Sequence, residues 1–593
     1  MRPRRWPTRR RTRNASPNSS AADPLPAITS IARRWNGESI TLAVLVVFVG
    51  LVSVLPVTRL VVEAFAPGGT PDLANIRTVL TAGSTWTAAW HSLVTATLGT
   101  AISLVLGTLF ALIVALTDIR AKAALVFCFL LPLMIPPQVT ALSWAQLFGP
   151  ASPLLITLGL APPLGSPNPI YSPGGIVLLL GIQHAPLVFL AVRAGLRGLP
   201  REMIEAARAC GAGRLRVMAT IVLPMMTPPL VAGGALAFVS AVGNFGIPAL
   251  LGIPAGYTVL PTLIYQRLAS FGPSIISEVA VLSIVVGALA FVGFAVQALV
   301  IGKRDYRTVG APAQALRYAL GRWRGPIEAL AWAIIVAILV VPLIALLATS
   351  LVTAYGVPLT GQTVTLSNYA EVLFRQDSTV RAFRNSFLLA AGTSLFLVAV
   401  CVPFAAFVVW RKSRLLDALA MMAELPYALP GIVLGIAAIL IFIMPLPVLG
   451  ISLYNTIWII FFAYLARFLT LSLRPVVGAV QQVDRALEEA ARMTGARYLF
   501  RLRTVVFPLL APAAAAGAIL TFMTSFNELT VSALLWSAGN ETLGVVVFNL
   551  DDSGATVLAS AVAAVTVVAI VAIMGVTALF ARRLPRGVLP WTD

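Results

Sequence analysis

The sequence predicts an all-α polytopic membrane protein with about twelve transmembrane helices in two parallel six-helix repeats. Three observations support this prediction: an apolar composition, long apolar runs, and one short motif that occurs twice. The chain has 593 residues, of which 59% are hydrophobic and only 11% are charged. A soluble protein would carry roughly twice that share of charged residues. A membrane protein is therefore the class that fits the composition.

Twelve apolar runs are long enough to cross the hydrocarbon core of a bilayer, which takes about 20 residues. They are 40–62, 92–117, 122–147, 174–196, 225–251, 276–301, 327–350, 386–410, 417–443, 453–473, 509–534 and 556–581. Prolines interrupt two of them, at Pro132, Pro136 and Pro137 in the third run and at Pro426 and Pro430 in the ninth. Because a proline frees a backbone carbonyl, we expect these two helices to be kinked and to face protein rather than lipid.

The basic residues are distributed unevenly between the two sides of the predicted membrane. The net charge of +20 could by itself suggest a nucleic-acid partner. However, the loops 148–173 and 535–555 on one side contain no Lys or Arg, whereas loops such as 193–216 and 474–503 on the other side are rich in both. This asymmetry follows the positive-inside rule. We therefore expect both termini in the cytoplasm and no nucleic-acid partner.

The Arg-rich start of the chain, MRPRRWPTRRRTR, has two further interpretations. It could be a targeting peptide or a twin-Arg export signal. The first apolar run begins well downstream of it, is longer than an ordinary signal core and lacks a small-x-small cleavage site. A basic, disordered cytoplasmic tail is the better interpretation.

A motif of twenty residues occurs twice, 284 residues apart. The first copy, EAARACGAGRLRVMATIVLP, ends at Pro224, and the second, EAARMTGARYLFRLRTVVFP, ends at Pro508. Upstream the two halves also match, at an offset of 294, through the pairs Ser92 and Ser386, Pro132 and Pro426, and Pro136 and Pro430. Two units of six spans each must have the same orientation, so we expect parallel repeats with a pathway between them.

This duplication divides the chain into five segments. They are a basic disordered tail (1–39), a first six-span domain (40–301), a basic cytoplasmic linker (302–326), a second six-span domain (327–581) and a cytoplasmic C-terminal tail (582–593).

Each copy of the motif is expected to form a helix–turn–helix at the membrane surface. Small or apolar residues recur at i, i+3, i+4 and i+7 and would form one face of a short helix. They are Met203, Ala206, Ala207 and Cys210 in the first copy, and Leu487, Ala490, Ala491 and Thr494 in the second. Gly211 and Gly495 permit the left-handed turn that ends such a helix. An amphipathic loop lying on anionic lipid is the alternative, but two copies without gaps favour docking on a partner.

The motif is similar to the EAA---G---------I-LP loop of the permease subunits of bacterial ABC importers. The first copy matches it fully, up to Ile221, Leu223 and Pro224, and the second departs at Val505 and Phe507. The resemblance covers nearly the whole chain, as two permease domains in tandem, and implies the transmembrane fold of a type I ABC importer in the bacterial inner membrane. It implies that each loop is a coupling helix contacting an ATP-binding subunit. The contact residues would be Glu205, Ala206, Ala207, Gly211, Glu489, Ala490, Ala491 and Gly495.

The same resemblance implies the partners. Two copies of an ATP-binding subunit would lie on the cytoplasmic side, and a periplasmic or extracellular solute-binding protein on the other. The P-loop pattern GxxxxGK[ST] does not occur in the chain, so we expect no catalytic residue here, with ATP and Mg bound by the separate ATPase. Two histidines and the three dispersed cysteines Cys128, Cys210 and Cys401 offer no metal site by the usual choice of ligands.

Polar residues within the apolar runs are candidates for the pathway, because such groups are costly in a membrane. The strongest candidates are Asn244 and its repeat equivalent Glu528, with Asn527 beside it. A structural hydrogen bond between helices is the alternative. Gln138, Gln183 and His184 are weaker candidates.

The cargo rests on resemblance alone. The segments 244–266 and 527–548 look most like those of ferric-iron permeases. Importers for thiamine, a phosphonate or a polyamine are the alternatives within the class. A secondary transporter driven by an ion gradient is the alternative from another class. The two EAA loops argue against it, because such a transporter does not need a coupling loop.

Overall fold

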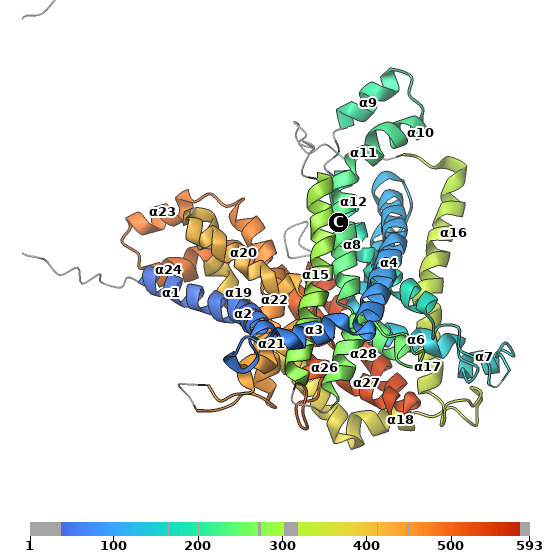
Figure 1. The fold of residues 1–593 in the computed structure, drawn as a ribbon. Coiled ribbons are helices and arrows are strands. Elements are labelled where there is room, and N and C mark those ends of the chain that lie inside the picture. Colours follow the sequence, from blue (N-terminus) through green and yellow to red (C-terminus); the bar gives the residue numbers. More distant parts are fainter. Residues whose placement is uncertain are drawn as a thin grey trace, which may run out of the picture.

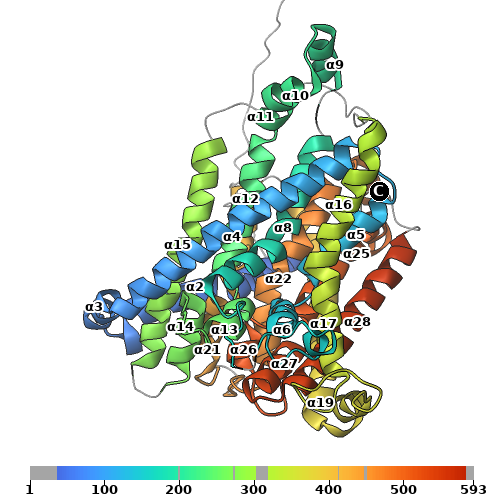
Figure 2. The ribbon, with the colours of Figure 1, turned by 90° about the vertical axis from the view of Figure 1, so that its right-hand side faces the viewer.

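The computed structural model describes residues 37–163, 165–197, 199, 201–270, 274–301, 318–411, 413–446 and 450–581. The described residues form helices joined by loops, with two isolated β-bridges and no strand among them (Figures 1 and 2). Most of the predicted tails and linker, at 1–36, 302–317 and 582–593, lies outside these residues. The all-α prediction is confirmed.

The helices of the first half follow the predicted order of spans. They are α1 (Gly37–Val49), α2 (Leu55–Phe65), α4 (Gly83–Leu116), α5 (Lys122–Met134), α6 (Pro137–Phe148), α8 (Pro173–Arg197), α12 (Thr227–Val242), α13 (Gly246–Gly252) and α15 (Ile275–Ile301). The shorter helices α3 (Leu73–Thr81), α7 (Pro153–Thr157) and α14 (Leu260–Leu268) lie between them.

The second half repeats this order. Its helices are α16 (Arg324–Ile335), α17 (Val341–Ser350), α19 (Asp377–Arg411), α20 (Arg414–Ala428), α21 (Gly431–Phe442), α22 (Ile457–Val480), α25 (Phe507–Phe526), α26 (Ser532–Leu535), α27 (Leu543–Asp552) and α28 (Thr556–Ala581), with α18 (Ser367–Ala370) in a loop. In the described part of the chain, ten helices are long and apolar enough to cross a membrane, or twelve if two bent pairs each count as one span. This agrees with the prediction of about twelve.

Four predicted spans are broken rather than continuous. The run 122–147 divides into α5 and α6 before Pro137, and 417–443 divides into α20 and α21, which bend by 106° at Pro430. The prolines in these two runs had predicted a kink at both places. The runs 225–251 and 509–534 also break, after α12 and after α25, and the expectation of one continuous helix there is wrong. At both breaks a polar side chain binds backbone N–H groups of the next short helix and so stabilises the interruption.

Repeat-related residues have matching partners. The Ser92 hydroxyl accepts a hydrogen bond from the Leu260 N–H at 2.8 Å, and the Ser386 hydroxyl accepts one from the Leu543 N–H at 2.9 Å. In both halves the span after the EAA loop also packs closely through a glycine: a Cβ at Gly517 would lie 2.8 Å from the Ser472 carbonyl oxygen. The two halves therefore share tertiary detail as well as sequence.

The first span of each half packs on the other half. Helix α2 lies against α21, and α17 lies against α6 (Figures 1 and 2). The Thr349 hydroxyl donates to the Gln146 side-chain oxygen at 3.3 Å. Near the linker, the Asp118 carboxylate accepts from the Leu320 N–H at 3.0 Å, and this hydrogen bond lowers the pKa of Asp118. The two halves are therefore interlocked and not merely adjacent.

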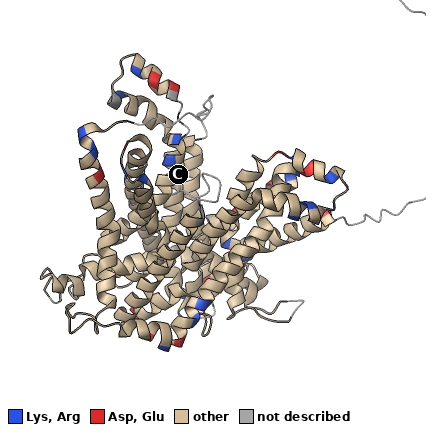
Figure 3. Cartoon of the chain, turned by 180° about the vertical axis from the view of Figure 1, so that it is seen from behind, with Lys and Arg blue, Asp and Glu red and all other residues tan. Residues whose placement is uncertain are grey.

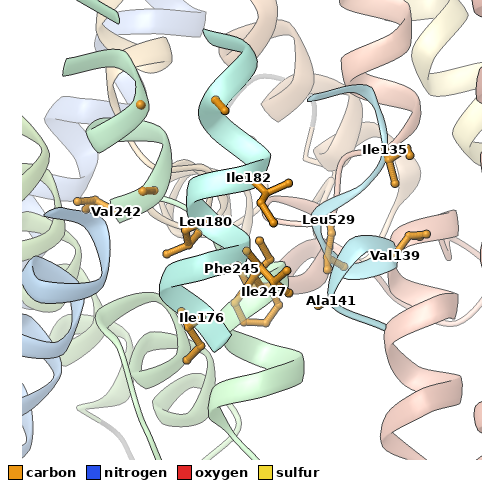
Figure 4. Close-up of a cluster of buried hydrophobic side chains, with 14 of the residues drawn as sticks. Ile135, Val139, Ala141, Ile176, Leu180, Ile182, Val242, Phe245, Ile247 and Leu529 are labelled. Atoms are coloured by element: carbon orange, nitrogen blue, oxygen red, sulfur yellow. The ribbon is translucent and has the colours of Figure 1, made fainter. Parts of the chain in front are cut away.

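The core continues across the boundary between the halves. Figure 4 shows Ile135 and Val139 from the first half around Leu529 from the second. The Phe245 ring lies 5.9 Å from the Phe548 ring, again across the boundary. Buried aromatic pairs of this kind contribute about 0.5–1.5 kcal/mol beyond the area that they bury.

Candidate functional site: two EAA loops and four broken helices

The first EAA loop is a short helix, a glycine turn and a second helix. Helix α9 (Arg201–Ala209) is followed by a turn at Gly211, which has a φ of +82°. The Gly211 N–H donates to the Arg208 carbonyl at 2.9 Å, and the Ala212 N–H donates to the Ala207 carbonyl at 3.0 Å. These two bonds form a Schellman motif, in which glycine avoids the cost of a left-handed residue. Helix α10 (Arg214–Val217) follows.

The second EAA loop has the same construction. Helix α23 (Ala486–Met493) is followed by a turn at Gly495, whose φ is +78° and whose N–H donates to the Arg492 carbonyl at 3.0 Å. Helix α24 (Tyr498–Arg501) leads back towards α25. Both loops lie on the same side of the molecule, opposite α18 and α27 (Figure 1). The predicted helix–turn–helix is thus present in both copies.

The motif residues show the same exposure in the two loops. The glutamate, the first alanine and the glycine are exposed, and the second alanine is half-buried. Their neighbours include apolar side chains that the chain leaves exposed: Met203 is 45% exposed and Met493 is 87% exposed. Charged residues gather on α9 and near α23 and α24 (Figure 3). Each loop therefore has an exposed surface that contains both apolar and charged side chains.

The inner faces of the two loops are built differently. In the first loop the inner positions are Ile204 and Val217, which are both buried in a hydrophobic cluster. The positions 284 residues further on are Glu488 and Arg501, and their side chains form an ion pair at 2.7 Å. The Arg501 guanidinium also lies 4.0 Å from the Glu38 carboxylate at the start of α1. The second loop is therefore tied to the N-terminal helix by charge.

The candidate pathway residues lie at the breaks in the helices. The Asn244 side-chain oxygen accepts from the Ile247 N–H at 3.1 Å and caps α13. The Glu528 carboxylate accepts from the Val531 N–H at 2.8 Å and from the Ser532 N–H at 3.1 Å, and caps α26. Both residues are 7% exposed. Each makes local hydrogen bonds to the backbone three or four residues further on, rather than a bond between neighbouring helices, and its role in a pathway stays a prediction.

These breaks meet the breaks of the opposite half. The Asn527 amide donates to the Met134 carbonyl of the other half at 3.0 Å, beside the break between α5 and α6. The repeat equivalent of Asn527 is Gly243, and a Cβ there would lie 3.1 Å from the Cβ of Pro430, at the break between α20 and α21. The four broken helices therefore meet in two pseudo-equivalent contacts between the halves.

A buried amide repairs the break in the first half. The Gln183 amide donates to the Pro132 carbonyl at 2.5 Å and to the Ile135 carbonyl at 3.1 Å. The carbonyl of Pro132 would normally accept from the N–H of residue 136, but that residue is a proline and has none. Gln183 therefore stabilises the break between α5 and α6.

The position equivalent to Gln183 in the second half is Arg467, which the sequence analysis missed. Its guanidinium lies 3.8 Å from the Glu528 carboxylate, and its side chain is 25% exposed. It also passes Gly431, where a Cβ would lie 2.7 Å from the nearest guanidinium nitrogen. The signal was a single arginine within an apolar run, FFAYLARFLTLSL. A charged pair, Arg467 and Glu528, thus stands where the first half has the neutral Gln183 and Asn244.

Two buried oxygen atoms at this meeting point have no hydrogen-bond partner among the described residues. They are the side-chain oxygens of Gln138, which is 1% exposed, and Asn527, which is 7% exposed. Unpaired buried groups of this kind are costly and call for an explanation.

No group of three or more His, Cys, Asp or Glu side chains in the described ranges is placed to hold a metal ion.

Two interlocked six-span halves, each with an EAA loop on the same side, define a multi-pass transport subunit. Comparison with known families makes this specific. Residues 103–356 and 378–586 each match the family described as "Binding-protein-dependent transport system inner membrane component". The chain belongs to this family, as a fusion of two of its domains, and is an ABC transporter permease.

Individual relatives support the same assignment. A Sinorhizobium fredii protein named "Probable ABC transporter permease protein y4fN" is 27% identical over 72% of this chain and 75% of its own length. The ferric transport system permease protein FbpB of Actinobacillus pleuropneumoniae is 25% identical over 76% of this chain and 65% of its own length. The molybdenum transport system permease protein ModB of Escherichia coli is 31% identical, but over only 32% of this chain and 81% of its own length.

Proposed function

We propose that this chain forms the whole translocation pathway of a bacterial importer and is driven by two copies of a separate ATPase. The two loops would be the docking points for that ATPase, with Glu205, Ala206, Ala207 and Gly211 and their equivalents Glu489, Ala490, Ala491 and Gly495 as contact residues. Their exposure supports the proposal, because an unpartnered apolar ridge flanked by charge is typical of an interaction surface. The side that carries the loops would then be cytoplasmic, and a solute-binding protein would dock on the opposite side.

The four broken helices would form the gate of the pathway. They hold the two halves together where Asn527 binds the Met134 carbonyl. If closure of the ATPase pair moves the loops, the halves shift at this contact, and the unpaired oxygens of Gln138 and Asn527 gain water or solute as a partner. Broken helices are suited to such a place, because irregular backbone at membrane depth is tolerated where it lines a cavity.

We further propose ferric iron as the cargo. The observation that carries this is domain organisation: the ferric permeases match across both halves of this chain, with 76% of it covered by FbpB of Actinobacillus pleuropneumoniae and 82% by FbpB 1 of Haemophilus influenzae. The molybdenum permease matches only 32% of this chain. Iron would be delivered by the binding protein, so that selection of the metal does not require a metal site in this chain.

An oxyanion such as molybdate is the second candidate, because of Arg467. A partly exposed guanidinium among the transmembrane helices would attract an anion, and it has no counterpart in the first half. The relative that transports molybdenum fits this alternative in its name, although not in its extent.

One experiment separates these cargoes. The permease, its ATPase and its binding protein are reconstituted in proteoliposomes, and ATP-dependent uptake of radiolabelled iron and molybdate is measured. Iron uptake without molybdate uptake is the expected result, and the reverse would overturn the ferric assignment. The double variant Arg467→Gln with Glu528→Asn reproduces the neutral pair of the first half and leaves no charge stranded. It should retain iron uptake, whereas an oxyanion carrier would lose its transport.

A further inference from the structure

A cleft of about 240 Å³ opens between the second EAA loop and the N-terminal helix. Its walls come from the start of α1, the end of α19, and the segment that runs from α23 to the π-helical turn after α24. Helix α19 ends at Arg411 and the path back into α25 begins near Leu502, so the cleft lies where the transmembrane helices end. The same place in Figure 1 is where α1, α23 and α24 come together.

The charged residues of the cleft do not balance. Four arginines line it, Arg411, Arg485, Arg492 and Arg501, against two glutamates, Glu38 and Glu488. Glu38 pairs with Arg411 at 3.1 Å, and Glu488 pairs with Arg501 at 2.7 Å. Arg485 pairs with a glutamate outside the cleft, and no partner of Arg492 occurs in the described part of the chain. One positive charge, that of Arg492, therefore remains without a counter-charge.

Among the four arginines that line the cleft, Arg501 is held in a fixed position. The Arg501 side chain is 8% exposed, and it donates to the Glu488 carboxylate and to the Ala496 carbonyl, each at 2.7 Å. A guanidinium that is held in this way loses little conformational entropy when it binds an anion. Guanidinium groups match phosphate oxygens in geometry as well as in charge. The charged wall therefore suits a phosphate group.

The rest of the lining is apolar or aromatic, and this distinguishes between sources of phosphate. Ala406, Phe407, Leu502 and Val506 line the cleft, together with the aromatic side chains of Trp410 and Tyr498. A free phosphate ion has no apolar part that could contact these side chains. A phospholipid has a phosphate at its head and acyl chains below it, and aromatic residues are enriched at the level where the two meet. The location at the ends of the spans fits the same ligand.

We propose that this cleft binds the phosphate headgroup of an anionic phospholipid and so braces the second EAA loop against the N-terminal helix. Clusters of basic residues between membrane helices, on the side that faces the cytoplasm, are suited to such lipids. The first loop has no equivalent site, because the positions of Arg411 and Arg501 are occupied there by Thr117 and Val217. One lipid would therefore support one loop of the two.

The test uses the purified full-length chain in a non-ionic detergent. Its thermal unfolding midpoint is followed on addition of short-chain phosphatidylglycerol, short-chain phosphatidylcholine or inorganic phosphate. Phosphatidylglycerol should raise the midpoint, and the other two should not. Equal effects of the two lipids would overturn the proposal. An equal effect of inorganic phosphate would show that the site takes free anions and would overturn the assignment to lipid.

Variants then locate the effect. Arg411→Gln removes one charge from the wall, and Glu488→Ile with Arg501→Val installs the uncharged pair of the first loop without stranding a charge. Both should weaken the apparent affinity for phosphatidylglycerol by about tenfold or more. Arg503→Gln is the matched control, since Arg503 is exposed on the same loop but does not line the cleft. A response of the cleft variants equal to that of Arg503→Gln would refute the site.

Discussion

The two EAA loops present similar outer faces but have different inner supports. Outside, the glutamate, the alanines and the glycine of each motif have the same exposure and the same turn geometry. Inside, the first loop buries Ile204 and Val217, and the second has an ion pair between the buried Arg501 and the half-buried Glu488. The duplication has thus preserved the surface that would meet a repeated partner, while the side that meets the rest of the chain has diverged.

This divergence follows from what each loop packs on. The second loop contacts α1 through Glu38, whereas the first stands away from the bundle on α11 (Leu223–Met225) and α12 (Figures 1 and 2). An apolar pair needs no partner to be stable when buried. A buried ion pair is stable only if its remaining polar groups find partners: Arg501 donates a hydrogen bond to the Ala496 carbonyl and lies 4.0 Å from the Glu38 carboxylate. Among the described residues, the second loop thus has a charged contact with the N-terminal helix that the first loop lacks.

The largest effect is expected where the loops are alike. Replacing both motif glutamates, Glu205→Ala with Glu489→Ala, should abolish measurable uptake and co-purification of the ATPase, because both docking surfaces lose a charged contact. Membrane insertion should be unchanged, since both side chains are exposed. Transport assays and pull-down of the ATPase measure the effect. Undiminished uptake would show that the loops are not the docking points.

The second prediction concerns the inner faces. Arg501→Ala leaves the half-buried Glu488 carboxylate without its partner, which should cost about 3 kcal/mol of stability, the low end for a broken buried pair, because that carboxylate keeps some contact with water. The double variant Glu488→Ile with Arg501→Val should cost less than about 1 kcal/mol, because the first loop shows that this pair fits the motif. Thermal unfolding of the purified chain compares the two. If the double variant is as unstable as Arg501→Ala, the supports of the loops are not interchangeable.

The sequence predicted the surface of the site better than its support. The EAA motif, the glycine turns and the twelve spans were visible because local pattern determines them: apolar runs, helix periodicity and a residue that tolerates positive φ. The inner pair of the second loop and the crossing of α2 onto α21 depend on residues far apart in the chain, for which a single sequence has no signal. Arg467 was missed for the same reason, since its partner Glu528 lies on another helix.

The broken spans show an intermediate case. Pro136 and Pro430 marked two of the four interruptions, because proline removes an N–H from the helix. The other two occur at Asn244 and Glu528, which were predicted as polar residues within continuous helices. Their polarity within an apolar run is visible in the sequence. The break in the backbone that they cap is not, because it depends on the contacts between the two halves.

The third prediction returns to the shared geometry. Gly211→Ala and Gly495→Ala each place a Cβ on a residue with positive φ, which costs about 1–2 kcal/mol. Nothing lies within 4 Å of the added carbon in either loop, so the cost is conformational and should be equal in the two. Thermal unfolding and uptake of the two single variants provide the comparison. A clearly larger loss in one loop would show that the turns are not equivalent.

The smallest effect is expected from the tie to the N-terminal helix. Glu38→Gln removes the carboxylate that lies 3.1 Å from Arg411 and 4.0 Å from Arg501. Arg411 is 44% exposed and water screens that pair, so the loss should be about 0.5–1 kcal/mol. Protection of the amide hydrogens, measured by exchange, should fall in 485–502 but not in 201–217. Glu424→Gln breaks an exposed pair of the same half, with Arg474, and is the control that should change neither segment. Equal loss of protection in both loops would mean that α1 stabilises the whole chain and not the second loop in particular.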